Sequence, residues 1–288
     1  MKKNNKKSVT RKNTESKTKI NWKLVKKIIL VVIIVACASI AVWNTWANTI
    51  PELNVITVTE KNLPADFDGY RIAHISDFHS TGKMTDKVIN LLRDAKPDII
   101  CITGDLMDSR DTNPDVALDF IEKAMEIAQC YFVTGNHELL VPRKLMDTLL
   151  EGMADRGVIL LDKEILQCGD SEIILIGDFF GTAKDEEYMY AYDGYRIFAS
   201  HYPENMDYFV AAKYDLVLAG HAHGGQVRLP LVGGLYAPGQ GVFPEYDAGL
   251  YSQGDTDMIL NRGIGNSTIP FRFNNRPEVV LVELKCAK

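Results

Sequence analysis

Short apolar runs alternate with amphipathic helical patterns from about residue 53 onward, and this alternation restricts the fold of the chain more than any other feature. The apolar runs that predict strands are residues 71–76, 98–103, 130–134, 173–176, 195–200, 214–219 and 279–284. Apolar positions three and four residues apart predict helices over 84–95, 117–128 and 145–153. A chain that repeats strand, loop and helix is typical of a layered α/β domain. Residues 220–277 are rich in Gly and Pro and predict loops.

The N-terminal part differs in character from this body. Residues 1–27 hold eleven Lys or Arg and one acid, and the absence of apolar periodicity predicts a disordered basic tail. Residues 28–46 carry no charge and are long enough, as a helix, to cross a bilayer core. Three lysines precede this run and two tryptophans, Trp43 and Trp46, lie at its end, where indoles favour the membrane interface. The chain therefore divides into a tail (1–27), a transmembrane signal-anchor (28–46) and a folded body (53–288).

Other interpretations of the apolar run stay open. A buried core helix is disfavoured by the adjacent basic tail, and a cleavable signal peptide is disfavoured by the length of that tail. Residues 34–37 resemble a bacterial lipoprotein cleavage box, so lipidation of Cys37 is an alternative to an uncleaved helix. Both the uncleaved helix and a lipidated Cys37 would tether the body to the membrane. Because basic residues precede the run, we expect the N-terminus to be cytoplasmic and the body to lie outside the cell membrane.

The charge of the body excludes one class of function. Residues 28–288 contain 21 basic and 37 acidic side chains, and an acidic surface binds nucleic-acid phosphates poorly, so no nucleic-acid partner is expected. The cysteines show no metal-binding spacing. Cys101 and Cys130 lie in apolar strand-like runs and are expected to pack in the core.

Polar residues cluster directly after the predicted strands. They are Asp77 and His79; Asp105 and Asp108; Asn136, His137 and Glu138; His201; and His221 and His223. Because strand ends of an open α/β sheet point to one edge, these residues are expected to converge on one site. His74 lies inside the first strand and is interpreted as a packed core residue.

The chemistry of this set indicates metal binding. Carboxylates, one carboxamide and several imidazoles, without a thiolate, suit Mn, Fe, Zn or Mg. The candidate ligands are too many for one tetrahedral site, so two metals are the natural number. Paired divalent metals are a common solution for phosphoryl hydrolysis.

With these residues in this order, the sequence resembles the calcineurin-like metallophosphoesterases. Their signature blocks D-x-H, G-D-x-x-D, G-N-H-[DE], a lone H and G-H-x-H all occur, at residues 77–79, 104–108, 135–138, 201 and 220–223. The segments HGGQVRLP, APGQGVFPEYDAGLY and RGIGNSTIPFRFNNRPE look like the membrane-associated bacterial branch. The resemblance implies a four-layer α/β fold in which two packed β-sheets are flanked by helices.

The resemblance also implies a role for each residue. Asp77, His79 and His223 would bind the first metal, Asn136, His201 and His221 the second, and Asp105 would bridge both. A hydroxide held between the metals would attack phosphorus, with Mn, Zn or Fe the expected ions and Mg also compatible. His137 would protonate the leaving group or stabilise developing charge. Asp108 and Glu138 would orient ligands or loops.

These implications predict a membrane-anchored two-metal phosphoesterase that hydrolyses phosphate mono- or diesters of a small-molecule or lipid-linked substrate at the cell envelope. The alternative enzyme is a pyrophosphatase of a nucleotide-linked lipid such as UDP-diacylglucosamine. A non-catalytic scaffold is the alternative from another class, disfavoured because no ligand is missing. Ser109, where phosphoprotein phosphatases carry Arg, counts against that branch. Arg262, Asn266 and Arg272 are expected either to contact phosphate or a head group, or to be surface loop residues.

Overall fold

The computed structural model describes residues 21–178 and 194–287, so most of the predicted basic tail lies outside the described residues. The chain divides into two units, residues 1–43 and 44–288. In the first unit, helix α1 begins at Trp22; its last turn, up to Ala47, belongs to the second unit. Within the described part, α1 is the helix that is long and apolar enough to cross a membrane, and its apolar side chains are exposed.

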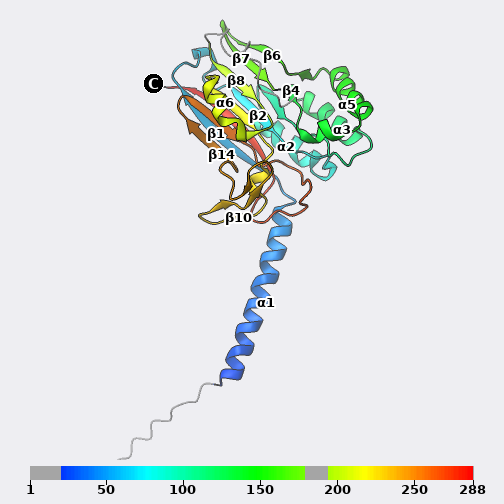
Figure 1. The fold of residues 1–288 in the computed structure, drawn as a ribbon, viewed down its shortest axis with the longest axis vertical. Helices are drawn as coiled ribbons and strands as arrows, with labels where there is room; N and C mark the ends of the chain where they lie inside the picture. Colours follow the sequence, from blue (N-terminus) through cyan, green and yellow to red (C-terminus); the bar gives the residue numbers. More distant parts are fainter. Residues whose placement is uncertain (1–20, 179–193, 288) are drawn as a thin grey trace, which may run out of the picture. The chain divides into compact units, whose positions relative to one another are not determined.

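The body contains two six-stranded sheets (Figure 1). The first sheet has the order β1 (Glu52–Glu60), β16 (Glu278–Cys286), β2 (Arg71–Ile75), β3 (Ile99–Thr103), β4 (Gln129–Val133) and β5 (Ile159–Leu160). The second has the order β14 (Gly249–Gln253), β15 (Thr256–Leu260), β9 (Leu216–Ala219), β8 (Arg196–Ala199), β7 (Ser171–Gly177) and β6 (Lys163–Cys168). Strands β2 to β5 run parallel in the first sheet, and β7, β8, β9 and β15 run parallel in the second.

Helices cover the outer faces of both sheets. They are α2 (Thr85–Ala95), α3 (Asp115–Met125), α5 (Arg143–Asp155) and α6 (Met206–Ala211). The short helix α4 (Asn136–Leu140) follows β4. Apolar residues of α2, α3 and α5 pack on one face of the first sheet, and α6 packs on the outer face of the second. A third cluster fills the space between the sheets. The arrangement confirms the predicted fold of two packed sheets flanked by helices.

Alternation along a strand explains this layering. In β3, Ile100 and Ile102 face the helices, whereas Ile99 and Cys101 face the second sheet. All four are buried, because successive side chains of a strand point to opposite faces. Burial of Cys101 and Cys130 confirms that these two thiols pack in the core.

The prediction of loops over residues 220–277 is only partly confirmed. It contains β14 and β15, together with two small hairpins formed by β10 (Arg228–Leu229), β11 (Gly233–Gly234), β12 (Tyr236–Ala237) and β13 (Gly241–Val242). Strands β10 to β13 have two residues each and β14 is largely exposed, so these elements show little hydrophobic periodicity. Strands β1 and β6 were missed as well, and both lie at the edge of a sheet, where one face is exposed.

The turns after β3 and β4 pack against each other at the sheet edge. Gly104 follows β3 with φ of +82°, and a Cβ atom at this position would approach the Cα of Gly135 to 2.6 Å and the carbonyl carbon of Thr134 to 2.8 Å. Both the left-handed φ and the close approach therefore require glycine.

Replacing Gly104 by Ala is expected to destabilise the body by more than the left-handed φ alone explains. Gly241 is a matched control, because it has φ of +80° and nothing within 4 Å of its Cβ position. We expect Gly104→Ala to cost at least ~1 kcal/mol more than Gly241→Ala, since only the first overpacks its site. Chemical denaturation of both full-length variants in detergent measures the difference, and equal losses would contradict the packing argument.

Candidate metal centre

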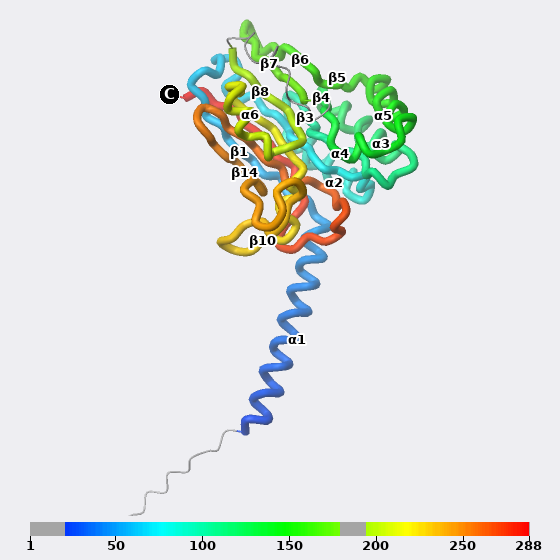
Figure 2. Tube along the Cα trace, in the orientation of Figure 1, coloured from blue at the N-terminus to red at the C-terminus, as the bar shows by residue number. Residues whose placement is uncertain are grey.

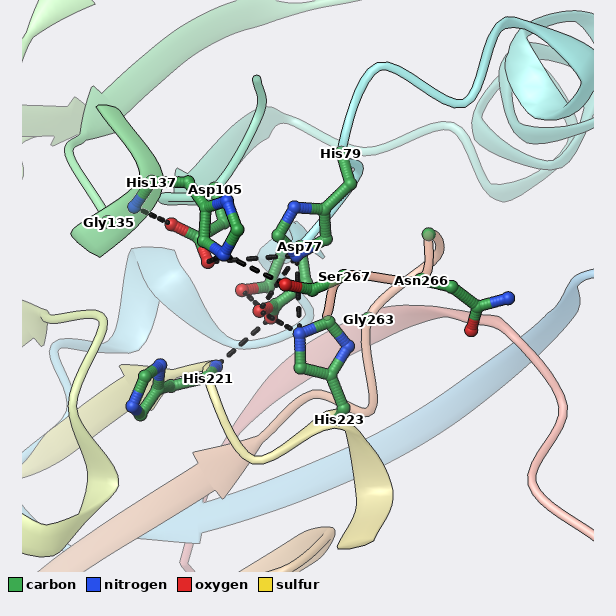
Figure 3. Close-up of polar contacts among 12 residues, drawn as sticks. Asp77, His79, Asp105, Gly135, His137, His221, His223, Gly263, Asn266 and Ser267 are labelled. Carbon is green, nitrogen blue, oxygen red and sulfur yellow. Dashed lines mark hydrogen bonds and ion pairs between the residues drawn. The ribbon is translucent and has the colours of Figure 1, made fainter. Parts of the chain in front are cut away.

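All seven residues expected to bind metal lie at the C-terminal ends of parallel strands. Asp77 and His79 follow β2, Asp105 follows β3, and Asn136 begins α4 directly after β4. The second sheet supplies His201 after β8, and His221 and His223 after β9. Figure 3 shows Asp77, His79, Asp105, His221 and His223 in one place, although they come from different strands.

Sharp backbone turns direct these side chains inward. Five of the seven residues have left-handed backbone angles, with φ between 47° and 69°: Asp77, His79, Asp105, His221 and His223. Such conformations are uncommon for residues other than glycine and concentrate at functional sites.

The first group of donors consists of Asp77, His79, Asp105 and His223, all buried. The Nε2 atom of His223 lies 3.2 Å from Oδ1 of Asp77 and 3.2 Å from Nε2 of His79. Nε2 of His79 lies 3.6 Å from Oδ2 of Asp105. The four donor atoms all lie within 4.8 Å of one another, close enough to be ligands of a single cation.

The second group consists of Asp105, His201 and His221, with Asn136 beside it. Nε2 of His201 lies 3.3 Å from Oδ2 of Asp105, 3.1 Å from Nδ1 of His221 and 3.2 Å from Oδ1 of Asn136. Nδ1 of His201 donates to the carbonyl of Thr103 at 2.8 Å, so the lone pair of a neutral ring is on Nε2 and faces the group.

Asp105 belongs to both groups through a single oxygen. Its Oδ2 faces His79 and His201, whereas its Oδ1 accepts a hydrogen bond of 2.8 Å from the backbone N–H of His137. A bridge between two cations would therefore use Oδ2.

The electrostatics of the site favour the neutral, metal-binding form of three histidines, His79, His221 and His223. Burial lowers the pKa of His79 and of His223, and it lowers the pKa of His221 to about 4, with neighbouring His201 adding to the effect. These rings are therefore neutral at neutral pH, which is the form that binds metal. For His201, burial would lower the pKa, but the charge and hydrogen bonding of Asp105 outweigh burial and raise that pKa to about 10. Burial also lowers the pKa of His74, to about 3. Unlike the other rings, His74 forms a hydrogen bond of 2.8 Å between its Nε2 and Oγ1 of Thr103, as expected for a packed core residue.

The donor set fits divalent metal ions. Among the described residues, Oδ1 of Asp77 and Nδ1 of His79 are buried without a hydrogen-bond partner. An unpartnered buried acceptor costs on the order of 1–3 kcal/mol. A cation beside Oδ1 of Asp77 would remove that cost, and the nitrogen and oxygen donors suit a borderline or hard metal.

Glu138 holds the turns that carry these ligands. It is fully buried and accepts backbone N–H bonds from Asp105 at 2.8 Å, Met107 at 2.9 Å and Gly135 at 2.8 Å. Burial and the charge of Asp105 raise its pKa to about 7, and the three N–H donors oppose that rise. Asp108 binds Arg110 through two hydrogen bonds to its guanidinium, of 2.7 and 2.6 Å, and its Oδ2 lies 3.7 Å from Nδ1 of His79.

His137 lies beside the centre, with its Nε2 atom 4.0 Å from Oδ2 of Asp105. Its Nδ1 accepts a hydrogen bond from the backbone N–H of Ser109 at 2.9 Å, so the proton of the neutral ring is on Nε2. Nε2 lies 2.8 Å from Oγ of Ser267. Ser267 was missed by sequence reasoning, and its partner lies 130 positions away along the chain. His137 also forms a third group of potential ligands with His79 and Asp108.

Of the three loop residues expected either to contact phosphate or a head group or to lie on the surface, only Asn266 is exposed. Arg272 is 1% exposed, and its guanidinium donates to Gly265 O at 2.6 Å and Arg262 O at 2.7 Å and lies 3.2 Å from Nδ1 of His223. Arg262 forms ion pairs with Glu52 and Glu278. Asn266 accepts from Nε of Arg272 at 3.0 Å, and Figure 3 shows its side chain pointing away from the cluster. These arginines stabilise the loop from within, so the expectation of either phosphate contact or surface exposure was wrong for Arg272.

A cavity of about 270 Å³ opens onto the centre. Its lining contains the predicted residues Asp105, Asn136, His137, His221 and His223, together with Gln226, Tyr236, Pro238, Ser267, Thr268 and Ile269. Gln226, Tyr236 and Pro238 show that the Gly-rich stretch after His223 contributes to the wall of the cavity.

Comparisons with known proteins agree with this centre. The family model described as calcineurin-like phosphoesterase matches residues 70–225. The uncharacterized metallophosphoesterase YkuE of Bacillus subtilis is 28% identical over 80% of this chain and 84% of its own length. The phosphodiesterase YaeI of Escherichia coli is 28% identical over 75% and 82%, respectively. The UDP-2,3-diacylglucosamine pyrophosphatase LpxG of Chlamydia trachomatis is 26% identical over 86% and 94%.

The matched segment contains every residue of both donor groups, and the fold is the one expected from the signature blocks. The chain belongs to the calcineurin-like phosphoesterase family and is a metal-dependent phosphoric ester hydrolase.

Proposed function

We propose that the protein is a membrane-anchored phosphoesterase that uses two divalent metal ions to hydrolyse phosphate mono- or diesters at the cell envelope. The observation that carries this proposal is the pair of buried donor groups that share Oδ2 of Asp105 at the floor of a cavity. Two bound metals would neutralise the phosphate oxygens and lower the pKa of the attacking water.

The side chains of the protein would divide the remaining work. Asp77, His79 and His223 would hold one ion, and Asn136, His201 and His221 would hold the other. Glu138 fixes the backbone of Asp105. His137 presents its Nε2–H group to the cavity. Because its Nδ1 is already an acceptor for Ser109, full donation of the Nε2 proton would leave an imidazolate. We therefore assign His137 a hydrogen bond to a phosphate oxygen, which stabilises charge in the transition state.

A second candidate is a pyrophosphatase that cleaves a nucleotide-linked lipid such as UDP-diacylglucosamine. The similarity to LpxG along nearly the whole length of that protein favours it. Release of a nucleoside monophosphate distinguishes this reaction from simple ester hydrolysis.

The anchor in this proposal is α1. Lys23, Lys26 and Lys27 lie at its start, and Lys61 is the first basic residue after its apolar run, so the N-terminus stays in the cytoplasm and the body crosses the membrane. A lipidated Cys37 is the alternative anchor and would leave the body on the same side.

Replacing Asp105 by Asn should abolish most of the activity. A carboxamide bridges two cations poorly, so we expect kcat/KM to fall by at least about a hundredfold toward aryl phosphodiesters. Asp119→Asn, which removes an exposed carboxylate on α3, should leave the rate unchanged. Metal analysis of the wild-type protein accompanies the assay. Less than one equivalent under metal-replete conditions contradicts the two-metal proposal.

Removing the imidazole of His137 should lower turnover without loss of metal. We expect His137→Ala to reduce kcat/KM by about a hundredfold, to a similar degree for activated aryl and unactivated alkyl esters, because a hydrogen bond to a phosphate oxygen does not depend on the leaving group. A loss that grows as the leaving group becomes poorer would instead identify His137 as a proton donor.

The orientation of the body can be tested with an epitope placed after residue 288. In intact cells stripped of their outer layers, added protease should remove this epitope, while a cytoplasmic marker protein stays whole. An epitope that is cut only after lysis would place the body in the cytoplasm and contradict the proposed topology.

A further inference from the structure

The body exposes large apolar side chains on two loop segments. Leu231, Val232, Val242, Phe243 and Phe271 are each more than half exposed, with Leu231 fully exposed, and Ile269 is 38% exposed. We name these six residues the apolar rim. They lie in two stretches without a charged residue, 229–243 and 263–271, although the body as a whole is acidic. An uncharged apolar surface of this kind is typical of a binding surface.

Hydrogen bonds join the two segments into one surface. The β12–β13 hairpin is tied back by the N–H of Phe243, which donates to the carbonyl of Leu235 at 2.9 Å. Arg228, at the start of the β10–β11 hairpin, donates its N–H to the carbonyl of Phe273 at 2.9 Å. Figure 2 shows the gold β10 region beside the orange-red segment at one end of the body.

The apolar rim borders the opening of the catalytic cavity. Ile269 belongs to both the rim and the cavity lining, and Ser267 and Thr268 precede it in that lining. Tyr236 and Pro238, from the β12–β13 hairpin, form another part of the wall. Any surface that binds the apolar rim would therefore place the molecules of which it consists next to the cavity.

The end of α1 within the body is bound to the same segment. Asn44 and Asn48 both donate through Nδ2 to the carbonyl of Arg272, at 2.8 and 2.7 Å, and the N–H of Asn274 donates to Oδ1 of Asn44 at 3.1 Å. Asn44 directly follows Trp43, the last residue of the other unit and close to the end of the apolar run. Near the end of the proposed transmembrane segment, the chain is thus hydrogen-bonded to the residue that follows Phe271.

We propose that the apolar rim inserts into the membrane interface, so that the cavity receives phosphate esters carried by lipids of that same bilayer. This inference rests on the proposed phosphoesterase activity and anchor and names the substrate class. The contacts of Asn44 and Asn48 favour a bilayer over a protein partner, because they fix the rim next to the point where the chain enters the membrane. The transfer of apolar side chains from water to the membrane interface lowers the free energy of the system.

The test compares two substrates with the same leaving group. The full-length protein is reconstituted in vesicles of phosphatidylethanolamine and phosphatidylglycerol, and p-nitrophenyl hexadecyl phosphate in the vesicles is compared with p-nitrophenyl ethyl phosphate in the water. We expect Leu231→Glu combined with Phe243→Glu to lower kcat/KM for the hexadecyl ester by about tenfold, equivalent to ~1.4 kcal/mol, and to leave the ethyl ester unchanged. Ile165→Glu, a matched control on β6 where Ile165 is 52% exposed, should change neither.

A second measurement does not depend on activity. A photo-reactive benzophenone amino acid replaces Leu231 in one sample and Ile165 in another, and cross-linked adducts are identified by mass. We expect lipid adducts at position 231 and only background at position 165. Cross-links between two copies of the chain, or equal lipid labelling at both positions, would overturn the proposal.

The outcomes separate failure of the inference from failure of the proposed function. Equal loss on both esters, or no loss on either, overturns the role of the rim. A wild-type protein that is metal-loaded but inactive on both esters overturns the proposed function, and the cross-linking result then decides by itself whether the rim enters the membrane.

Discussion

The carboxylate of Asp105 is almost completely shielded from water, yet the fold keeps it charged. Burial alone would raise its pKa, but the charge of the His201 imidazole and its hydrogen bond to the carboxylate hold that pKa well below the usual value. The backbone N–H of His137 satisfies one oxygen and leaves the other facing both donor groups. A change in the position of this one side chain would alter the geometry of both groups together.

The turns around Asp105 support one another through the backbone. His79 N–H donates to the carbonyl of Asp105 at 2.9 Å, and Asp77 N–H donates to the carbonyl of Gly104 at 3.1 Å. Left-handed φ angles at Asp77, His79 and Asp105 are unfavourable by on the order of 1 kcal/mol each. The three apolar clusters on and between the sheets stabilise the strands that hold these turns, so conformational strain is concentrated where the side chains must converge.

Local patterns explain what could be predicted. A strand that is buried on both faces, such as β3, appears in the sequence as an apolar run. A polar residue directly after such a strand lies at the edge of the sheet where ligands bind, so it can be predicted as a site residue. Edge strands such as β1 and β14 expose one face and give a weaker signal. Ser267 and Arg272 carry no local signal at all, because their partners His137 and His223 lie 130 and 49 positions away and meet them only in the folded chain.

Arg272 shows how such non-local contacts connect parts of the molecule with different tasks. Its carbonyl accepts hydrogen bonds from Asn44 and Asn48, and its guanidinium lies against Nδ1 of His223 and donates to Gly265. Since Arg272 is itself buried and hydrogen-bonded to these partners, the segment has little freedom to move independently of the end of α1. Hydrogen bonds within the body therefore fix the positions of the apolar rim and of His223 relative to Asn44, which lies near the end of the apolar run.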